Sequence, residues 1–488
     1  MRRAPEDPRP TPHARSSALA LALALTPACG DTPLVKGETT AGATTNGTGT
    51  GTDATSTGTA GETTTGETTG EPTDTQPSFY GSPPRNLLVL SIDTLRHDRL
   101  PRYGGDPETL VFLNSIAEEG YALDQHRSCS NWTFASMLCY MTGATNVDVG
   151  FIPQLSEAYR APVPQGVETL PQWLSERGYF TLLSTSNSWF SDQWNMAHGF
   201  QWTNGDKRGS ATFMYDIARP AMIAAVESGL PWYFHLHFIE PHAAYNPPAE
   251  YLEGLDALEP IDVDLSSKDD HYAIKGMWGK MTPEEQELLL AHLLVRYEGE
   301  LRYIDDQLAA LWLQMNADGL LDDTLVLIIT DHGEQFWEHG AQTHGYGFHP
   351  EENDALAIFW ADNIVPGSWD GPTNHTDLAP TILSLLDIPA PAQVTGMPVG
   401  TAPDDRVEFG ASACKSGVVQ SVQVGDRKLQ YSWWGDKWYY RHDLDPLEAQ
   451  NLYDPQDPDV VALWELLLPE VTKAATLVPN LTPALPGP

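Results

Sequence analysis

Three short, nearly continuous apolar runs occur along the chain, at residues 86–92, 231–239 and 324–330. An unbroken apolar run of this length is typical of a strand that is buried on both faces of a sheet. Stretches with helical character lie between and around these runs, at residues 110–119, 133–142, 168–177 and 284–314. Strands that alternate with helices predict an α/β fold, in which a mostly parallel central sheet is sandwiched by helices.

The pattern changes near residue 401. Short alternating runs then follow one another, at residues 418–424, 428–434 and 438–443. Alternation with a period of two predicts a small antiparallel sheet, and a helix is expected after it near residues 460–471. We therefore expect a main domain over residues 81–400 and a small C-terminal subdomain over residues 401–488.

Residues 30–80 are rich in Thr, Gly and Glu and contain almost no large apolar side chains. Such a segment cannot bury enough apolar surface to offset the entropy that is lost when it is ordered. We predict a disordered linker over this range, which holds the folded part of the chain away from an anchor.

The segment at residues 1–29 has the pattern of an export signal peptide. Arg2 and Arg3 precede an apolar run at residues 18–25, which is too short to span a bilayer. The run ends in Thr-Pro-Ala-Cys-Gly, which resembles a bacterial lipoprotein cleavage site with Cys29 as the acylated residue. An ordinary cleaved signal is the alternative. Both readings predict an exported protein, in the periplasm or at the cell surface, and the first adds a lipid anchor at Cys29.

The acidic composition narrows the range of partners. The chain of 488 residues has 66 acidic and 27 basic residues, which gives a formal net charge of −39. This charge repels nucleic acid and anionic membrane surfaces. It repels an anionic substrate as well, so such a substrate needs a local positive feature such as a bound metal ion. No run of about 18 apolar residues follows the N-terminal segment, so the sequence predicts no transmembrane helix.

Three cysteines remain if Cys29 carries lipid, namely Cys129, Cys139 and Cys414. At most one disulfide forms among three thiols, and the sequence leaves the choice of the pair open.

Two of the predicted buried strands end in carboxylates. Asp93 directly follows residues 86–92, and Asp331 and His332 follow residues 324–330. Ligands of open α/β sheets bind at the carboxyl ends of the strands. Two carboxylates and an imidazole are suitable ligands for Zn²⁺, Mn²⁺ or Mg²⁺. A lone aspartate after a strand is more often a turn or cap residue, but the pairing with Asp-His-Gly-Glu favours a metal site.

Thr133 is expected in the first turn of the helix at residues 133–142. The backbone N–H groups and the dipole at a helix N-terminus stabilise an alkoxide or a bound oxyanion. A metal ion bound to the hydroxyl would lower its pKa further and activate it as a nucleophile. The alternative is that Thr133 only caps the helix.

Histidines gather near the end of the second apolar run. His235 and His237 alternate onto one face of the strand, and His242 lies in the loop beyond it. His242 is a candidate to protonate a leaving oxygen or to bind a substrate oxygen. His237 is expected to be buried and hydrogen-bonded.

Further candidates follow the metal pair. In the segments Glu338-His339-Gly340 and His344-Gly345, the histidines would contact substrate or bind more metal, unless they are ordinary loop residues. His375, at the start of another predicted helix, is a candidate for an additional metal ligand.

Taken together, these pieces resemble the sulfatase family of the alkaline phosphatase superfamily. The matching segments run in family order through residues 84–454, at residues 86–103, 132–143, 237–245, 330–345, 375–386 and 443–452. The resemblance implies an alkaline phosphatase-like fold. It also implies one divalent metal ion, Mn, Zn, Ca or Mg, held by Asp93, Asp331, His332 and the nucleophile.

The family nucleophile is found by counting back along the pattern Cys/Ser-x-Pro-Ser-Arg-x-x-x-x-Thr-Gly. The Thr-Gly pair of this chain is Thr142-Gly143, and the count reaches Thr133, whereas Cys129 and Cys139 are out of register. The resemblance therefore implies that Thr133 is both a metal ligand and the nucleophile. His242 or His344 would then assist the leaving group.

The chain departs from true sulfatases at four places. Sulfatases convert a Cys or Ser nucleophile to formylglycine, and Thr133 is not a substrate for that conversion. Ala135 and Met137 replace the Pro and Arg of the motif, residues 185–188 replace a Gly-Lys-x-His segment, and Thr94 replaces a second Asp. The pattern is similar to family members with an unmodified threonine, which include phosphodiesterases, phosphonate monoester hydrolases and phosphoglycolipid transferases.

We therefore expect an exported, metal-dependent hydrolase that cleaves sulfuric or phosphoric esters through Thr133. Its substrates would be small-molecule, glycan or lipid esters and not nucleic acid, and the chain would reach the membrane only through Cys29. The oligomeric state stays open. One alternative is an enzyme that transfers a phospho-group to a glycan or lipid. Another is a surface binding protein that has kept the fold and lost catalysis.

Overall fold

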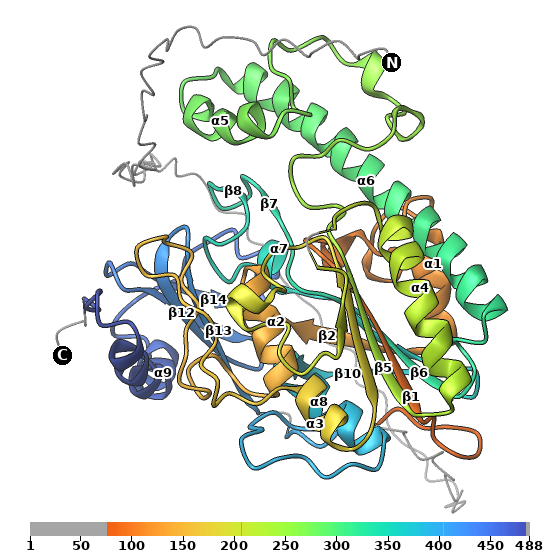
Figure 1. The fold of residues 1–488 in the computed structure, drawn as a ribbon. Coiled ribbons are helices and arrows are strands. Elements are labelled where there is room, and N and C mark those ends of the chain that lie inside the picture. Colours follow the sequence, from red (N-terminus) through yellow and green to blue (C-terminus); the bar gives the residue numbers. More distant parts are fainter. Residues whose placement is uncertain (1–75, 206, 404, 485–488) are drawn as a thin grey trace, which may run out of the picture. The chain divides into compact units, whose positions relative to one another are not determined.

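The computed structural model describes residues 76–205, 207–403 and 405–484. Its largest element is an eight-stranded sheet with the order β10-β2-β9-β6-β1-β5-β3-β4 (Figure 1). The strands are β1 (Asn86–Ile92), β2 (Tyr121–Arg127), β3 (Phe180–Thr185), β4 (Trp202–Thr203), β5 (Trp232–Phe238), β6 (Thr324–Thr330), β9 (Ala357–Trp360) and β10 (Gly367–Asn374). Neighbouring strands are parallel except around β9, which runs antiparallel to β2 and β6.

Strand β1 lies between β5 and β6 in the sheet. Its last residue, Ile92, is paired with Phe238 of β5 and with Thr330 of β6. The three apolar runs of the sequence are therefore neighbours, and their carboxyl ends lie at the same edge of the sheet. The residues that follow these strands meet at that edge.

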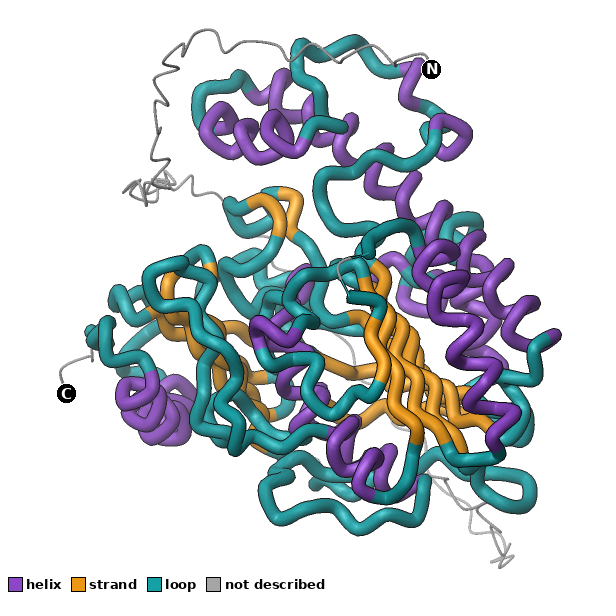
Figure 2. The backbone as a smooth tube through the Cα atoms, viewed as in Figure 1, coloured by secondary structure: helices purple, strands orange, loops and turns teal. Residues whose placement is uncertain are grey.

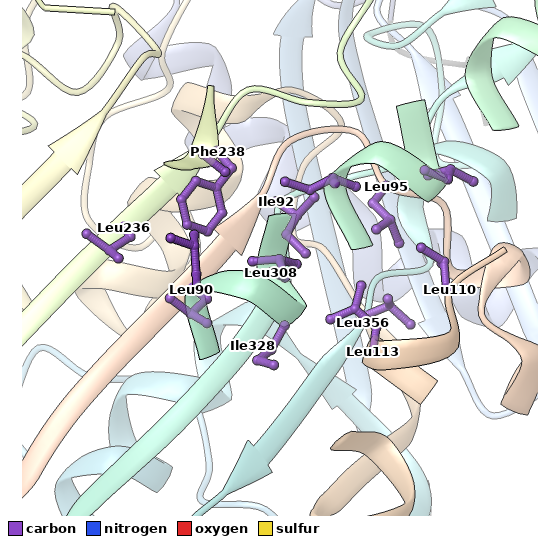
Figure 3. Close-up of a cluster of buried hydrophobic side chains, with 14 of the residues drawn as sticks. Leu90, Ile92, Leu95, Leu110, Leu113, Leu236, Phe238, Leu308, Ile328 and Leu356 are labelled. Atoms are coloured by element: carbon purple, nitrogen blue, oxygen red, sulfur yellow. The ribbon is translucent and has the colours of Figure 1, made fainter. Parts of the chain in front are cut away.

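Helices cover both faces of the sheet (Figure 1). One face is covered by α1 (Val111–Glu119), α4 (Ala211–Ser228) and α6 (Pro283–Ala317), and the other by α2 (Thr133–Thr142), α3 (Leu170–Glu176) and α8 (His375–Leu385). Leu90 of β1 and Ile328 of β6 pack with Leu308 of α6 in the first core, part of which Figure 3 shows. Leu87 and Val89 of β1 belong to the second core. Because both faces are buried, β1 has the unbroken apolar sequence.

A second, antiparallel sheet lies near the C-terminus, and Figure 2 shows it as a separate group of strands. Its strands, in the order in which they pair, are β11 (Val407–Cys414), β12 (Gly417–Val424), β13 (Arg427–Ser432) and β14 (Lys437–Arg441). Helix α9 (Pro458–Leu477) packs on it through Leu463 and Leu467, against Val422 and Leu429. The predicted α/β fold with a small antiparallel C-terminal sheet is confirmed.

The remaining α-helices and strands lie beyond the carboxyl edge of the main sheet (Figure 1). They are α5 (Lys268–Trp278), α7 (Pro350–Asn353) and the hairpin strands β7 (Gln335–Phe336) and β8 (Gln342–Thr343). The hairpin directly follows Asp331 and His332 in the chain, so it lies close to the strand ends that carry the candidate ligands.

Several elements were not predicted from the sequence, among them β2, β10 and α4. Strand β2 ends in the polar residues 124–127, and β10 is an edge strand that contains Gly371 and Pro372. Pro220 lies inside α4, a residue that usually ends a helix. In each case the local pattern of apolar and polar residues is weak, and contacts with distant segments stabilise the strand or helix.

The predicted signal peptide and most of the predicted linker lie outside the described residues. Phe79, inside the range predicted as linker, forms a bridge with Ile364, and Tyr80 N donates to Asn363 O at 2.8 Å. Ordered structure therefore begins a few residues before the predicted boundary. Among the described residues, no helix is long and apolar enough to cross a membrane.

Candidate metal and catalytic site

Two aspartates meet at the carboxyl edge of the central strands. The backbone N–H of Asp93, directly after β1, donates to Phe238 O at 3.0 Å, and that of Asp331, directly after β6, donates to Ile92 O at 3.4 Å. Both aspartate side chains are fully buried. Within the described part of the chain, Asp93 Oδ1 and Asp331 Oδ2 have no hydrogen-bond partner. Buried carboxylate oxygens without partners are costly, and such atoms are suited to bind a cation.

His332 completes the cluster. Its Nε2 lies 3.4 Å from Asp331 Oδ2 and 3.8 Å from Asp93 Oδ1. One ligand atom from each of the three residues lies within 4.8 Å of the others. Oxygen and nitrogen donors at such separations can converge on a single divalent cation. The structure thus brings together the three residues that the sequence singled out, and their chemistry fits a divalent metal ion.

The electrostatics of the two carboxylates agree with this fit. Burial raises the pKa of Asp331, and the neighbouring charge of Asp93 raises it further. Burial also disfavours the charged form of Asp93, but His242, His237 and His332 together outweigh it and lower the pKa of Asp93. Two buried carboxylates of like charge resist joint ionisation, and a divalent cation between them would remove that conflict.

Thr133 is the first residue of α2, and Trp132 is its N-cap. The hydroxyl oxygen of Thr133 lies 3.4 Å from Asp93 Oδ2 and 3.4 Å from His332 Nε2. The alternative that Thr133 only caps α2 is not supported, because Trp132 occupies the cap position and no side chain caps this end. The hydroxyl therefore faces the cluster from a helix N-terminus, which favours a negatively charged oxygen.

A disulfide joins the segment before Thr133 to the body of α2. Cys129 and Cys139 are bonded to one another, and Cys414 is free. Burial raises the pKa of the Cys414 thiol to about 12, so this cysteine is not an activated thiolate. The sequence left the pair open, and the docking of the 129–132 segment on α2 decides it.

Two side chains that the sequence did not assign to the site contact Asp93. Asn187 Nδ2 donates to Asp93 Oδ2 at 2.8 Å, and His237 Nε2 lies 3.5 Å from the same oxygen. His237 is buried with its Nδ1 2.7 Å from Ser91 Oγ, as expected, but its Nε2 has no hydrogen bond among the described atoms. Asn187 lies in residues 185–188, which the sequence marked only as a departure from a motif. The sequence signal that could have identified Asn187 is the polar run at residues 185–188, which follows an apolar strand.

His344 and His242 lie beside the cluster. The ring of His344 has its centroid 4.3 Å from that of His332 and 5.2 Å from that of His242. His344 Nδ1 is 2.9 Å from Glu334 Oε1, and Tyr245 OH donates to Glu334 Oε2 at 2.9 Å. Because a carboxylate only accepts, Nδ1–H donates to Glu334 and Nε2 is the nitrogen presented to a substrate. Burial lowers the pKa of His344, which favours its neutral form.

The sulfatase family model matches residues 85–388, more than half of the chain. This chain belongs to the sulfatase family. All six of the predicted site residues lie within the matched range: Asp93, Thr133, His242, Asp331, His332 and His344. The chain is similar to the arylsulfatase of Clostridium perfringens, with 22% identity over 292 residues, which cover 56% of this chain and 57% of that relative.

Solved structures share the sulfatase-family fold. The structure of BT4656 in complex with its substrate D-glucosamine-2-N,6-O-disulfate superposes with a TM-score of 0.62 at 17% identity and covers 82% of this chain and 99% of its own. The phosphonate monoester hydrolase SpPMH from Silicibacter pomeroyi gives a TM-score of 0.60 at 19% identity, with coverages of 80% and 95%. At these identities the likeness shows the fold alone, and it confirms the expected alkaline phosphatase-like architecture.

Other candidates from the sequence lie away from this sulfatase-family cluster. Glu338 Oε1 pairs with Arg96 at 2.6 Å, and His339 stacks on His349 with ring centroids 3.6 Å apart. The two ring nitrogens of His375 each lie 3.0 Å from a backbone carbonyl oxygen. His375 is therefore not supported as an additional metal ligand, because its nitrogens face the backbone and not the cluster.

Proposed function

We propose that this chain is a metal-dependent hydrolase of sulfuric or phosphoric esters in which Thr133 is the nucleophile. The observation that carries the proposal is the position of Thr133 Oγ1, 3.4 Å from both Asp93 Oδ2 and His332 Nε2. Asp93, Asp331, His332 and Thr133 would hold the metal ion. When bound, a divalent ion of Mn, Zn, Ca or Mg lowers the pKa of the Thr133 hydroxyl and withdraws charge from a non-bridging ester oxygen.

The first half of the reaction forms an ester on Thr133. The Thr133 hydroxyl donates to Asp93 Oδ2 at 3.4 Å, and its proton is released to solvent when Oγ1 is deprotonated. Oγ1 then bonds to the phosphorus or sulfur atom as the bond to the alcohol oxygen breaks. The N-terminal N–H groups of α2 stabilise the charge on Oγ1. The leaving oxygen takes a proton from Nε2 of the imidazolium form of His242 or His344, in which both ring nitrogens carry a proton.

The second half returns the enzyme to its starting state. A threonyl ester cannot eliminate its group, unlike a hydrated aldehyde, so water must attack the central atom. The histidine that gave its proton to the leaving group is now neutral and accepts a proton from this water. The lowered pKa of His344 disfavours its imidazolium form, which favours His242 as the acid of the first half. Direct attack by water is more familiar for phosphoric than for sulfuric esters, which places phosphoric esters first.

The relatives support both ester classes. One is an arylsulfatase, and a protein of the same fold is a phosphonate monoester hydrolase. Since the arylsulfatase alignment spans only 57% of that enzyme, its substrate class comes to this chain as a proposal.

Export is part of the proposal. The Cys129–Cys139 disulfide supports it, because disulfides form and persist in oxidising compartments outside the cytoplasm. The predicted anchor at Cys29 lies outside the described residues. The substrates would then be small-molecule, glycan or lipid esters met in the periplasm or at the cell surface.

A substrate panel tests the proposed reaction. The wild-type protein is offered p-nitrophenyl sulfate, bis(p-nitrophenyl) phosphate and p-nitrophenyl phenylphosphonate, each with Mn²⁺ or Zn²⁺. Turnover that is lost in Thr133→Ala, together with a phosphorylated or sulfated Thr133 peptide after an acid quench of the wild type, supports the proposal. Turnover that survives Thr133→Ala overturns the assignment of the nucleophile.

The same panel separates the two alternatives. If an added alcohol acceptor takes up the phospho-group in place of water, the chain is a transferase. If the protein binds metal in a fixed stoichiometry but turns over none of the esters, it is a surface binding protein that has kept the fold.

A further inference from the structure

The C-terminal sheet places a lysine next to the candidate site. The turn between β11 and β12 is docked on the chain beside His344, where Lys415 N and Ser416 N donate to Gly345 O at 3.0 and 3.3 Å. A Cβ atom on Gly345 would lie only 2.5 Å from Cys414 Sγ, so the two segments are in close contact. The position of Lys415 is therefore set by the segment that carries His344.

The side chain of Lys415 reaches the residue before His344. Lys415 Nζ donates to Thr343 Oγ1 at 2.7 Å. Thr343 has a φ of 68°, a left-handed conformation that is uncommon for a β-branched residue. The surrounding contacts hold the Thr343 backbone in this conformation, and its hydroxyl anchors the ammonium group of Lys415 near the site.

Two aromatic rings flank Lys415. Its Nζ lies 5.9 Å from the ring centroid of Tyr272 on α5 and 5.5 Å from that of Tyr346. Burial raises the pKa of Tyr272, and the charges of Glu334 and Asp93 raise it further, so its phenol lies within electrostatic reach of the metal cluster. Lys415, Tyr272 and Tyr346 thus form one polar-aromatic wall on the His344 side of the cluster.

The charge of Lys415 lowers the pKa of the buried Glu352 against the effect of burial, but Lys415 forms no close ion pair. No carboxylate oxygen of the described residues forms a salt bridge with its Nζ, although the side chain is partly buried. In contrast, Lys428 is paired with Glu448 and Lys473 with Asp148, each at 2.8 Å. Lys415 differs from these other lysines in its place beside His344, and in a chain with 66 acidic and 27 basic residues a partly buried lysine there without a salt bridge points to an anionic ligand.

We infer that Lys415 is a specificity-determining residue that binds an anionic group on the alcohol part of the ester. This inference rests on the proposed function. The metal cluster would hold the group that is transferred, whereas Lys415 lies beyond His344 and reaches the part that leaves. The substrate is then an ester of an acidic alcohol, one with a carboxylate, sulfate or phosphate of its own. Tyr272 and Tyr346 offer aromatic faces for its carbon skeleton.

Binding of the alcohol product tests the inference without turnover. Calorimetry compares 4-nitrophenol with its carboxylated analogue, 5-hydroxy-2-nitrobenzoate, on metal-loaded wild type, Lys415→Met and Lys415→Arg. We expect the carboxylate to improve the affinity of the wild type about tenfold, or about 1.4 kcal/mol. Lys415→Met should lose this gain, and Lys415→Arg should keep most of it. Lys437→Met, at the opposite edge strand of the same sheet, is the matched control and should behave as wild type.

Turnover provides the second measurement. The ratio of kcat/KM for the carboxylated and plain aryl esters should fall about tenfold in Lys415→Met, with the melting temperature unchanged. If wild type and Lys415→Met bind the carboxylated phenol equally, or if the wild type binds neither phenol, the inference is wrong even where ester turnover supports the proposed function. Charge-dependent binding without turnover of any ester would overturn the proposed reaction and leave the role of Lys415 standing.

Discussion

The chain buries carboxylates at two centres whose surroundings differ. At the C-terminal sheet, Glu448 forms a salt bridge with Lys428 Nζ at 2.8 Å. Its oxygens also accept hydrogen bonds from three donors: His442 Nε2 at 2.7 Å, His349 Nδ1 at 2.8 Å and Gln430 Nε2 at 3.3 Å. Burial alone would raise the pKa of Glu448, but Lys428 and the two histidines hold it well below its usual range. This carboxylate is fully compensated by the protein itself.

The pair formed by Asp93 and Asp331 shows the opposite arrangement. Each has an oxygen without a hydrogen-bond partner among the described residues, and burial and the charge of Asp93 raise the pKa of Asp331. A buried charge whose hydrogen bonds are complete stabilises the fold or sets its geometry, whereas buried oxygens without partners indicate a ligand. The comparison therefore separates a structural centre from the candidate functional centre, although both are buried.

Removal of the nucleophile should have the largest effect. Thr133→Ala is expected to lower kcat by about 10⁴-fold or more, because the reaction loses the atom that attacks. The melting temperature should stay close to that of the wild type. Steady-state kinetics on the best ester of the panel measure the loss, and Thr133→Ser, which keeps a hydroxyl, should retain part of the rate. A loss of less than about tenfold in Thr133→Ala would contradict the assignment.

Disruption of the structural centre should act on stability. Glu448→Gln leaves Lys428 buried without a countercharge, so the free energy of unfolding should fall by about 3–5 kcal/mol. Urea denaturation measures this change. Glu465→Gln, on the exposed face of α9, is the matched control and should change it by no more than about 0.5 kcal/mol. Equal stabilities of the two variants would show that the Glu448 cluster is not structural.

Neutralising a carboxylate at the candidate functional centre should change the free energy of unfolding in the opposite direction. Without metal, Asp331→Asn removes a buried charge next to Asp93, so the variant should be more stable than the wild type by about 1–3 kcal/mol. With metal present, the wild type should gain stability and Asp331→Asn should gain little. Metal analysis and denaturation with and without a chelator measure both effects. Full metal content and full turnover in Asp331→Asn would contradict the metal site.

The pH dependence of the free energy of unfolding should also distinguish the two centres. This is the smallest of the expected effects, about 1 kcal/mol per pH unit. The pKa of Asp331 is raised in the metal-free folded state, so its contribution to stability is present below about pH 4 and is lost as the pH rises. The pKa of Glu448 is lowered, so its contribution is present above about pH 4.5 and is lost as the pH falls. Urea denaturation between pH 3.5 and pH 8 checks both pH dependences. The metal-free wild type is compared with Asp331→Asn and with Glu448→Gln, and the difference in stability between wild type and variant gives the contribution of each residue. Parallel curves for all three proteins would contradict them.

Much of the main sheet was predictable from local pattern. β1, β5 and β6 are apolar runs because both faces of the sheet are covered, and the sequence shows this directly. Strands such as β2 and β10 were missed because their own residues are mixed, and their formation depends on partners far away in the chain. The same limit applies to the site, where Asn187 reaches Asp93 across 94 positions of sequence.

The sequence by itself determined which groups end the central strands and begin α2. Asp93, Asp331, His332 and Thr133 follow from patterns a few residues long, because a strand end and a helix start are local features. The tertiary structure alone decided that Cys129 pairs with Cys139, that Glu448 is fully compensated, and that Lys415 lies beside His344. These are contacts between segments whose approach depends on how whole sheets and helices pack, and short-range spacing carries no information about that packing.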